Sequence, residues 1–432
     1  MSPARAAALD ILAAVRRGAL LDRALDRRAS GLDPADRRLA QELSYGVLRL
    51  RARLDARLGR RVRGGLARVE PSVQDALRLG LYQLTELDRV PDHAAVDESV
   101  EAAREAAGAG AASLVNAVLR RVAREGVEAD EFPDPKGDPV GWAATWGSHP
   151  RWLVERWLAR HGADAMRALV DANNRRPAVA LTLLGLDVET ARRRLAERGI
   201  DARDAPLAVG SLEIETGDLA AALETVPAVV QDPAAALVTQ FADPPPGAQV
   251  VDLCAAPGGK SLRWAASGRR VFAVDRSRER LRRLEENCAR TGLHVPILCA
   301  DAAHPPFRPA DCVVLDAPCT GTGTLRRHPD ARWRLEPSDL EALTTLQRAL
   351  LAGAAGATRP GGLLIYATCS LEPEENEDPV NAFLDAHDEF EREPPSALPR
   401  GVRTDRGDLF VFPPDAGTDG AFAARLRRRS RA

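Results

Sequence analysis

The chain has 432 residues, of which 45% are apolar and 28% charged, and its net charge is −2. At about 100 to 200 residues per domain, this length predicts two or more domains, each with a core of its own. No apolar run approaches the ~18 residues that a membrane span needs, and the beginning lacks the apolar stretch of a secretory signal, so we expect a cytoplasmic protein without a membrane partner.

Cysteine usage excludes two further classes of protein. The six cysteines include no C-x-x-C pair. We therefore expect neither a disulfide scaffold nor a structural zinc site, and no metal is predicted. The cysteines are interpreted as free thiols.

The basic residues are unusual in both type and distribution. They comprise 58 arginines and only two lysines, Lys136 and Lys260, so a lysine inside a glycine-rich loop, as Lys260 is, stands out. Residues 1–126 hold 22 arginines against 17 acidic residues, a balance of +5 that leaves −7 for the rest of the chain. This asymmetry indicates an anionic partner for the front of the chain.

Residues 1–125 are predicted to form an all-α domain. Asp33 followed by Pro34 is typical of a helix start, and apolar residues then recur three or four positions apart. This spacing predicts one buried helical stripe, made by Leu39, Leu43, Val47, Leu50, Leu54 and Leu58. Further helices are predicted from Pro71 and around Leu114.

The rest of the chain is predicted to contain a linker and two more domains. Residues 126–145 are rich in prolines and acidic residues without periodicity, which is typical of a linker. Residues 146–243 are predicted to be a small α+β module that binds RNA. In residues 244–432, apolar runs alternate with helical stretches, which predicts an α/β domain with a Rossmann-like parallel sheet covered on both faces. The predicted strands are 250–253, 271–275, 296–301, 312–319 and 362–370.

Polar residues at the ends of the first three of these strands suit a nucleoside cofactor, because such sheets bind ligands beyond the carboxyl ends of their strands. Asp275 stands where a carboxylate would hold a ribose diol, and Asp301 is within reach of an adenine edge. The first strand runs into a loop of small residues before a helix, which lets the backbone approach a ligand closely. This loop comprises Cys254, Ala255, Ala256, Pro257, Gly258, Gly259 and Lys260.

The loop has neither the G-x-x-x-x-G-K-[ST] pattern of a P-loop nor the G-x-G-x-x-G pattern of a hydride-transfer cofactor site. S-adenosylmethionine therefore fits better than ATP or a dinucleotide. The alternative interpretation is that these glycines and aspartates only shape turns and helix caps.

Two thiols and a carboxylate follow the last two predicted strands, where Asp316 and Cys319 end one strand and Cys369 ends the other. This arrangement suits covalent catalysis on a pyrimidine, since addition of a thiolate at C6 turns C5 into a nucleophile that accepts a methyl group. Cysteines are more often small core residues, and we adopt that interpretation for Cys288, Cys299 and Cys312.

Cations beside an aromatic ring just after the Cys319 loop predict contacts with RNA. These residues are Arg326, Arg327, His328, Arg332 and Trp333. The C-terminal arginines are a weaker candidate, because they could form a frayed tail without function. They are Arg425, Arg427, Arg428, Arg429 and Arg431.

Longer strings of the sequence resemble known families. VVDLCAAPGGK, VVLDAPCTGTGTLRRHPDARW and IYATCSLEPEENE are similar to motifs of the RNA cytosine-C5 methyltransferases of the NOL1/NOP2/Sun (Fmu) family. GLYQLTELDRVPDHAAVDESVEAA and LVNAVLRRV resemble the RNA-binding fold of the antitermination factor NusB. Together these resemblances cover nearly the whole chain.

The resemblance implies a class I methyltransferase domain that acts on 16S ribosomal RNA, free or in an early assembly form, as a monomer. It implies that Cys369 attacks C6, that Cys319 assists release of the product, and that Asp316 contacts both the base edge and the cofactor. S-adenosylmethionine would be held by the 254–260 loop, Asp275, Arg280, Asp301 and Asp316.

The chain departs from the family pattern near its C-terminus, where Ala421 stands in place of an aromatic residue and puts one aromatic contact in doubt. Thr320 stands where serine is common, and we expect this change to be harmless. Two other functions stay open. One is a transfer RNA cytosine methyltransferase, which the NusB-like front disfavours. The other is an RNA-binding assembly factor with a vestigial methyltransferase half, which the intact thiols and cofactor loop disfavour.

Overall fold

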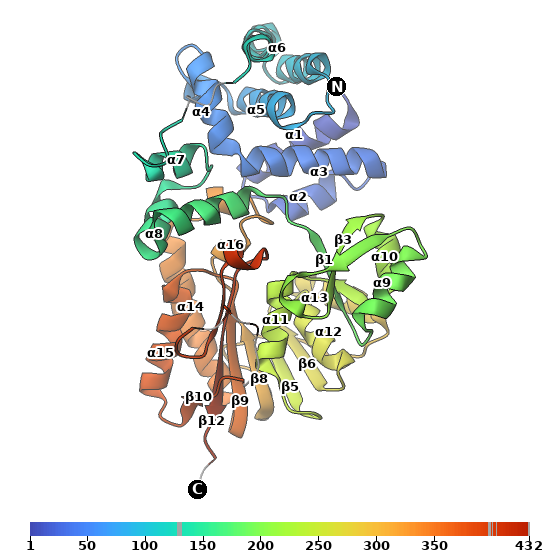
Figure 1. Cartoon of the computed structure of the whole chain (residues 1–432), viewed down its shortest axis with the longest axis vertical. Coiled ribbons are helices and arrows are strands. Elements are labelled where there is room, and N and C mark those ends of the chain that lie inside the picture. Colours follow the sequence, from blue (N-terminus) through green and yellow to red (C-terminus); the bar gives the residue numbers. More distant parts are fainter. Residues whose placement is uncertain (128–131, 396–398, 400, 403, 431–432) are drawn as a thin grey trace. The chain divides into compact units, whose positions relative to one another are not determined.

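The computed structural model describes residues 1–127, 132–395, 399, 401–402 and 404–430 and is drawn in Figure 1. The chain divides into two compact units, Met1–Arg175 with Leu325–Arg334, and Arg176–Thr324 with Leu335–Ala432. The chain therefore leaves the first unit, builds part of the second, and returns to the first for one short segment. None of the helices in the described ranges combines the length and the apolar character that a bilayer crossing requires.

The first unit is built from helices, as predicted for the front of the chain. They are α1 (Pro3–Arg16), α2 (Leu21–Arg28), α3 (Pro34–Arg49), α4 (Arg51–Arg61), α5 (Pro71–Glu86), α6 (Asp92–Glu125), α7 (Pro139–Thr145) and α8 (Arg151–Asn174). The Asp33 carboxylate caps α3 by accepting from the amides of Ala35 and Asp36, which satisfies two of the amides that a helix start leaves open. The cap and Pro34 at the first position together fix where α3 begins.

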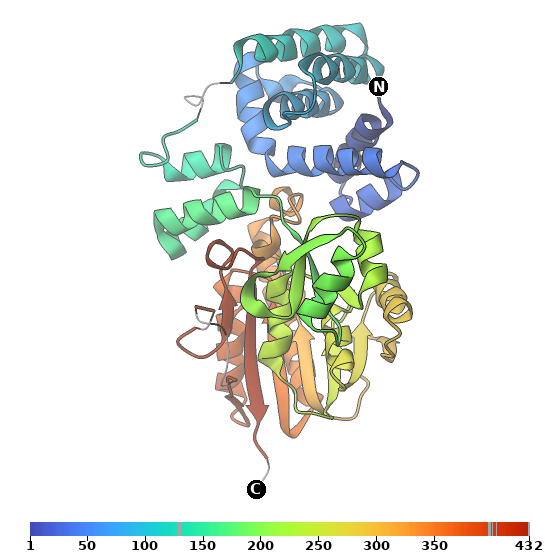
Figure 2. The ribbon, with the colours of Figure 1, turned by 45° about the vertical axis from the view of Figure 1, so that its right-hand side comes forward.

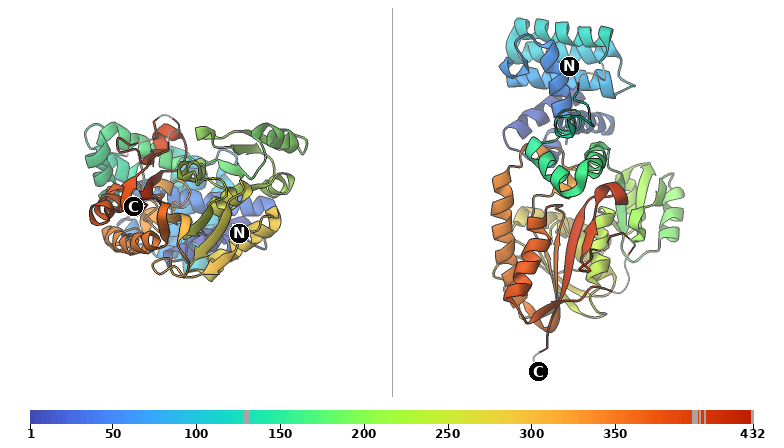
Figure 3. Two further views of the ribbon diagram at one scale, coloured as in Figure 1. Left: turned by 90° about the horizontal axis from the view of Figure 1, so that it is seen from below. Right: turned by 60° about the vertical axis from the view of Figure 1, so that its left-hand side comes forward.

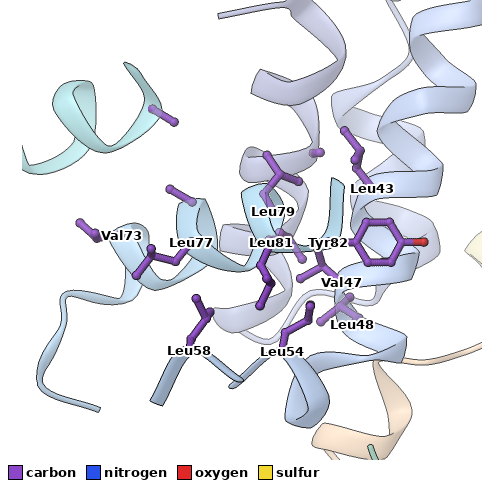
Figure 4. Packing of buried hydrophobic residues seen from close by; sticks show 14 of the residues in the cluster. Leu43, Val47, Leu48, Leu54, Leu58, Val73, Leu77, Leu79, Leu81 and Tyr82 are labelled. Atoms are coloured by element: carbon purple, nitrogen blue, oxygen red, sulfur yellow. The ribbon is translucent and has the colours of Figure 1, made fainter. Parts of the chain in front are cut away.

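The predicted single stripe from Leu39 to Leu58 is wrong in one respect. The helix stops at Leu50, whose φ of −106° and ψ of 17° separate α3 from α4. Side chains of both helices still meet in one core, in which Leu43 and Leu54 are fully buried (Figure 4). The periodicity therefore identified the buried face but not the break.

The end of the predicted linker is folded. Residues 128–131 of that segment lie outside the described residues, but α7 forms within it and packs against α8. The Arg53 side chain donates to the Trp146 carbonyl at 2.8 Å, and its guanidinium lies 3.9 Å from the centre of the Trp146 ring. The first unit therefore continues to Arg175, past the boundary predicted at residue 146.

The second unit holds two sheets. The smaller one has the strand order β2-β3-β1-β4, with antiparallel pairs throughout, and appears as green arrows in Figure 2. Its strands are β1 (Val179–Leu183), β2 (Asp201–Asp204), β3 (Ser211–Thr216) and β4 (Ala228–Val230), accompanied by α9 (Val188–Ala196) and α10 (Leu219–Thr225). This α+β module was predicted.

The larger sheet has the order β10-β12-β9-β8-β5-β6-β7, and β11 pairs with β12. Its strands are β5 (Gln249–Leu253), β6 (Arg270–Asp275), β7 (Ile297–Cys299), β8 (Ala310–Asp316), β9 (Thr358–Thr368), β10 (Phe390–Arg392), β11 (Leu409–Val411) and β12 (Ala421–Arg428). The five predicted strands are confirmed as β5 to β9, and they run parallel. The last strand, β12, lies antiparallel to β9.

Helices cover both faces of this sheet. Alternate residues along each strand point to opposite faces, so Val313 packs in a cluster with Leu350 of α14, whereas Val314 packs in a cluster with Leu262 of α12. The helices are α11 (Pro233–Ala242), α12 (Gly259–Ala266), α13 (Arg278–Thr291), α14 (Pro337–Gly356), α15 (Glu377–Ala386) and α16 (Pro413–Ala416). Figure 3 shows α14, in orange, running beside the strands. The strand order reverses between β5 and β8, which is where such sheets bind ligands.

Candidate active site

The carboxyl ends of the parallel strands surround a cavity of about 250 Å³. Seven predicted site residues line it, namely Cys254, Asp275, Arg280, Asp301, Asp316, Cys319 and Cys369. The rest of the predicted cofactor loop is not in the lining. Sequence reasoning missed Arg276, Ala302, Ala317, Pro318, Leu346 and Leu350, which complete it. The last two lie on α14, far along the chain, and no local pattern connects them with the strand ends.

The loop between β5 and α12 is shaped by two left-handed residues, Cys254 with a φ of 63° and Gly258 with a φ of 101°. A Cβ atom at Gly258 would lie 2.2 Å from Leu284 Cδ1, so only glycine fits there. Burial raises the pKa of Cys254 to about 12, and nearby acidic groups add to the effect. Its thiol is therefore neutral, and it forms part of the lining of the cavity.

Asp275 is held in place at the end of β6 and is only 3% exposed. One carboxylate oxygen accepts from the Ser277 amide at 2.8 Å, and the other accepts from the Ala256 amide at 3.3 Å. Arg280 Nη1 lies 3.6 Å from the second oxygen. A carboxylate has about four acceptor positions, so two remain for the hydroxyls of a diol. Asp301 lies two residues beyond β7 and is exposed.

A half-buried ion pair joins the cofactor loop to the end of β8, where Lys260 Nζ donates to Asp316 Oδ2 at 2.7 Å. Burial alone would lower the pKa of Lys260, but Asp316 outweighs it and the pKa is raised. The same ammonium lies near enough to interact electrostatically with Cys369. Lys260 is not among the residues that line the cavity, but its positive charge acts on two residues that do, Asp316 and Cys369.

The two thiols predicted at the strand ends come together, with Cys319 Sγ and Cys369 Sγ 3.4 Å apart. The hydrogen bond to Cys369, together with burial, raises the pKa of Cys319 well above its usual range. Either sulfur could donate in this hydrogen bond, and a Cys319 thiol that keeps its proton is able to donate to Cys369. Such an arrangement stabilises a thiolate on Cys369, which is the nucleophilic form of cysteine.

A fully buried carboxylate that sequence reasoning missed holds the Cys319 loop. Glu375 accepts from the Thr320 amide at 2.9 Å, from the Thr320 hydroxyl, and from Gln347 Nε2 at 3.0 Å. The Glu375 carbonyl also accepts from the Tyr366 hydroxyl at 2.6 Å. Thr320 supplies the hydroxyl that this network needs, which fits the expectation that threonine is harmless there.

Glycines bring three segments of backbone together beside the thiols. The Gly323 amide donates to the Cys369 carbonyl at 3.0 Å, and the Gly420 amide donates to the Gly323 carbonyl at 2.8 Å. A Cβ atom at Gly323 would lie 2.7 Å from that Cys369 oxygen and 2.8 Å from Gly420 Cα. Ala421, where the family usually has an aromatic residue, packs in the core cluster that contains Phe241.

The remaining thiols of this domain differ from one another. Cys312 is a core residue, as predicted, and burial raises its pKa to about 12. Cys288 is half-buried. Cys299 was predicted to be a core residue but is exposed, because β7 lies at the edge of the sheet.

The structure contradicts the RNA contact predicted for Arg332. Its side chain is fully buried in the first unit, where its guanidinium donates to protein oxygens. The Trp333 ring is half-buried, packs against the helical core, and donates from Nε1 to the Leu48 carbonyl at 2.7 Å. Arg326 is also buried. Arg327 is half-buried and His328 is exposed, so an RNA contact by these two stays a prediction.

The C-terminal arginines are not a frayed tail up to the last described residue, since most of them belong to β12. Arg425 and Arg427 both pair with Glu393, each at 2.6 Å. The hydrogen bonds from Arg427 and Arg425 lower the pKa of Glu393 to about 2. Arg431 lies outside the described residues. The arginines of β12 therefore stabilise the sheet.

Comparison with known proteins identifies three regions of the chain. Residues 239–427 match the family model of the 16S rRNA methyltransferase RsmB/F, residues 2–124 match the NusB family, and residues 149–218 match the ferredoxin-like domain of RsmF/B-like methyltransferases. These matches support the all-α front, the small module and the α/β domain.

Relatives match along nearly the whole chain. Ribosomal RNA small subunit methyltransferase B of Vibrio vulnificus is 33% identical over 99% of both chains, and a putative methyltransferase of Mycobacterium tuberculosis is 37% identical over 99% of this chain and 97% of its own. Among solved structures, the crystal structure of PH0851 has a TM-score of 0.77 at 25% identity and covers 99% of both chains. The chain thus belongs to the RsmB/F family of 16S rRNA methyltransferases, and it is an S-adenosylmethionine-dependent methyltransferase.

Proposed function

We propose that this enzyme methylates C5 of a cytosine in 16S ribosomal RNA through a covalent bond between Cys369 and C6 of the base. The observation that carries this proposal is the pair of thiols 3.4 Å apart at the ends of β8 and β9, in the cavity that Asp275 and Asp301 also line. A methyltransferase that modifies an exocyclic nitrogen or a ribose hydroxyl needs no nucleophile of its own, whereas C5 of cytosine is too weakly nucleophilic to react unaided.

The cavity fits the cofactor in its donor set. Asp275 has two acceptor positions left for a ribose diol, and the carboxylates of Asp301 and Asp316 lie on the same lining. When bound, S-adenosylmethionine supplies a methyl group on a positively charged sulfur. The chain's own residues then have three tasks, which are to bind the cofactor, to activate the base, and to move the C5 proton.

Activation of the base is assigned to Cys369. Its thiolate forms a bond to C6, and the electron pair of the C5–C6 double bond becomes available at C5, which takes the methyl group. Loss of the C5 proton then restores the double bond and expels the Cys369 thiolate. Lys260 stabilises that thiolate before attack and after release, because its ammonium interacts with the Cys369 sulfur.

Proton transfer is assigned to Cys319, and the electrostatics of the pair support this order of events. In the free enzyme the pKa of Cys319 is raised mainly by its hydrogen bond to Cys369. Once Cys369 is bonded to C6, it is neither an anion nor a strong acceptor, so the main cause of the raised pKa is gone. Cys319 then gives its own proton to water more readily, and the resulting thiolate accepts the proton from C5. Asp316 contacts the base edge from the end of β8.

The substrate class is inferred from the relatives, whose names specify the small ribosomal subunit. The target base has to leave its stack to reach the thiols, which is cheapest in a single-stranded or loosely folded region. We therefore assign free 16S RNA or an early assembly intermediate as the substrate. The balance of +5 in residues 1–126 suits recruitment of its phosphates.

The test compares Cys369→Ala with Cys319→Ala on unmodified 16S RNA and on a transfer RNA transcript. We expect Cys369→Ala to abolish methyl transfer while its affinity for S-adenosylmethionine stays unchanged. Cys319→Ala is expected to accumulate a protein–RNA adduct that survives denaturation. Full activity of Cys369→Ala would overturn the covalent role, adduct accumulation by Cys369→Ala instead would reverse the two roles, and preferential methylation of the transfer RNA would overturn the substrate.

A further inference from the structure

We infer that Glu375 is a positioning residue that keeps the proton of the thiol pair on Cys319 and so leaves the negative charge on Cys369. The two sulfurs are 3.4 Å apart, and either of them could donate in that contact. A neighbouring group therefore has to decide which sulfur becomes the nucleophile. The inference rests on the proposed roles of the two cysteines, and every residue that it uses belongs to the second compact unit.

The Glu375 carboxylate is linked to both neighbours of Cys319 along the chain. Its Oε1 accepts from the Thr320 amide at 2.9 Å, and its Oε2 accepts from the Thr320 hydroxyl. On the other side, Gln347 Nε2 donates both to Glu375 Oε1 at 3.0 Å and to the Pro318 carbonyl at 2.9 Å. The carboxylate is therefore held in one place beside the Cys319 loop.

The charge of this carboxylate is buried without a cation beside it. Glu375 is fully buried, and its donors are a backbone amide, a hydroxyl and a side-chain amide. In the described part of the chain it forms no ion pair. Of the helices that pack against its segment, α14 contributes the neutral Gln347, and α15 begins with Glu377, which interacts with Asp408. Because charges interact more strongly in a protein interior than in water, a second negative charge on Cys319 is costly.

A positive charge favours the anion on the other sulfur, since the Lys260 ammonium interacts electrostatically with Cys369. The pKa of Cys319, by contrast, is raised well above its usual range, first by its hydrogen bond to Cys369, then by burial, and further by the charge of Glu375. With a carboxylate beside one sulfur and an ammonium beside the other, the thiol pair is polarised, and the anion lies on Cys369.

The other ionisable groups around the pair leave this polarity unchanged. The Tyr366 hydroxyl donates to the Glu375 carbonyl at 2.6 Å, and burial, with Cys319 and Glu375, raises its pKa well above the usual range, so it stays neutral. Asp316 is bonded to Lys260 at 2.7 Å. Four more residues line the cavity that both sulfurs face, and their formal charges cancel. They are Asp275, Arg276, Arg280 and Asp301.

The substitution Glu375→Gln removes the charge and keeps the hydrogen bonds. The amide oxygen can accept from the Thr320 amide and from Gln347, and the amide nitrogen can donate to the Thr320 hydroxyl. If Glu375 merely held the loop, this variant would behave like the wild type. Glu375→Asp is the complementary variant, because it keeps the charge but shortens the side chain and disturbs these bonds. Glu374→Gln is the matched control, since Glu374 is only half-buried and solvent screens its charge.

The first measurement is the ratio in which limiting iodoacetamide labels Cys369 and Cys319 in the full-length enzyme without RNA. The thiolate is the reactive form, both sulfurs line the same cavity, and mass spectrometry of peptides separates them from the other cysteines. A neighbouring charge changes an ionisation equilibrium about 10- to 1000-fold, so the ratio of Cys369 label to Cys319 label should fall at least about tenfold in Glu375→Gln. In Glu375→Asp and Glu374→Gln the ratio should stay within about threefold of the wild type, less than loss of a neighbouring charge causes.

The second measurement is single-turnover methyl transfer to unmodified 16S RNA between about pH 6 and pH 9, on both sides of the ordinary pKa of a cysteine. Methyl groups are counted on RNA that is free or still bonded to the protein, so the later proton transfer does not enter. Without the carboxylate both sulfurs ionise more easily, and Cys319 gains more than Cys369. At high pH part of the anion then lies on Cys319 and the rate falls, whereas at low pH the Cys369 thiolate is no rarer than in the wild type. The loss of rate in Glu375→Gln should therefore grow with pH, while a loosened loop would lower the rate equally at every pH.

The inference is wrong if Glu375→Gln keeps the wild-type labelling ratio, or if its loss of methyl transfer is the same across the pH range. Should Glu375→Gln fail to fold, Glu375→Asp decides. A wild-type ratio in that variant supports the role of the charge, and a fall of about tenfold, as large as loss of the charge would cause, overturns it. Failure of the proposed function looks different, because Cys369→Ala would then be fully active, whereas the labelling ratio is measured without RNA.

Discussion

Replacing Asp275 with asparagine is expected to weaken binding of S-adenosylmethionine without disturbing the fold. In the structure the carboxylate accepts from two backbone amides and keeps about two further acceptor positions for a ribose diol. Asparagine retains one oxygen for the Ser277 amide but loses the charge and one acceptor. A hydrogen bond to a charged group contributes about 1.5 to 3 kcal/mol, so loss of one such bond raises Kd about 10- to 150-fold.

Isothermal titration calorimetry with S-adenosylmethionine and with its demethylated product measures this effect directly. Asp311→Asn is the matched control, because Asp311 also accepts from a backbone amide, that of Gln249 at 2.8 Å, but lies near the beginning of β8, whereas the cavity is lined by Asp316 at the end of that strand. Its affinity for the cofactor should equal that of the wild type. If Asp275→Asn binds within threefold of the wild type, the ribose is held elsewhere and the assignment of Asp275 is wrong.

Three further substitutions test other parts of the site. Glu375→Ala should lower the free energy of unfolding by at least about 3 kcal/mol, because three buried donors lose their acceptor; urea denaturation measures this, with Glu375→Gln as a milder control, and equal stability of both variants and the wild type would contradict it. Gly323→Ala should reduce kcat in a methylation assay about 10- to 100-fold at unchanged cofactor affinity, because its Cβ would displace the Cys369 backbone. Gly356→Ala is the control and should leave kcat unchanged, because a Cβ at Gly356 meets open space. Wild-type turnover of Gly323→Ala would argue against tight packing between Gly323 and Cys369. Burial raises the pKa of Asp252 from 3.8 to about 7, so between these pH values the folded protein keeps a proton that the unfolded chain has lost. The free energy of unfolding should therefore fall as pH rises from about 4 through 7. Asp252→Asn should make the free energy of unfolding less dependent on pH in denaturation curves at pH 5 and pH 8, and an unchanged pH dependence would refute the link.

The parts of the site that sequence reasoning predicted share one property, which is that they follow continuous apolar runs. Parallel strands end at the same edge of a sheet, so Asp275, Asp316, Cys319 and Cys369 had to come near one another once the runs were identified as strands. The lining of the cavity contains all four. Two features of the site could not be predicted from the sequence: the distance between the two thiols, and which of the thiols keeps its proton. Both depend on the paths of the loops that follow β8 and β9.

The sequence-based predictions were wrong where the same residue types occur both on a solvated or RNA-binding surface and in the protein interior. Arg332 and Trp333, a cation beside a ring, have the composition of an RNA contact, and only the distant carbonyls of Leu48 and Arg49 show that both belong to a core. Glu375 stands among other acidic residues in the sequence, which is typical of a solvated surface. In the structure it is fully buried and accepts hydrogen bonds from Thr320 and Gln347. Partners this far apart in the chain leave no trace in local spacing or periodicity.

The discontinuity of the helical unit has a consequence for biosynthesis. Residues 176–324 are translated between its two parts, and at about 5 to 20 residues per second this takes roughly 10 to 30 seconds. During that time α3 and α8 have emerged from the ribosome, but the Arg332 guanidinium that joins them has not been made. Until then the helical unit lacks residues 325–334, and it can be completed only after β5 to β8 have been synthesised. A graft of the NusB-like front onto another protein would therefore have to include residues 325–334 as well.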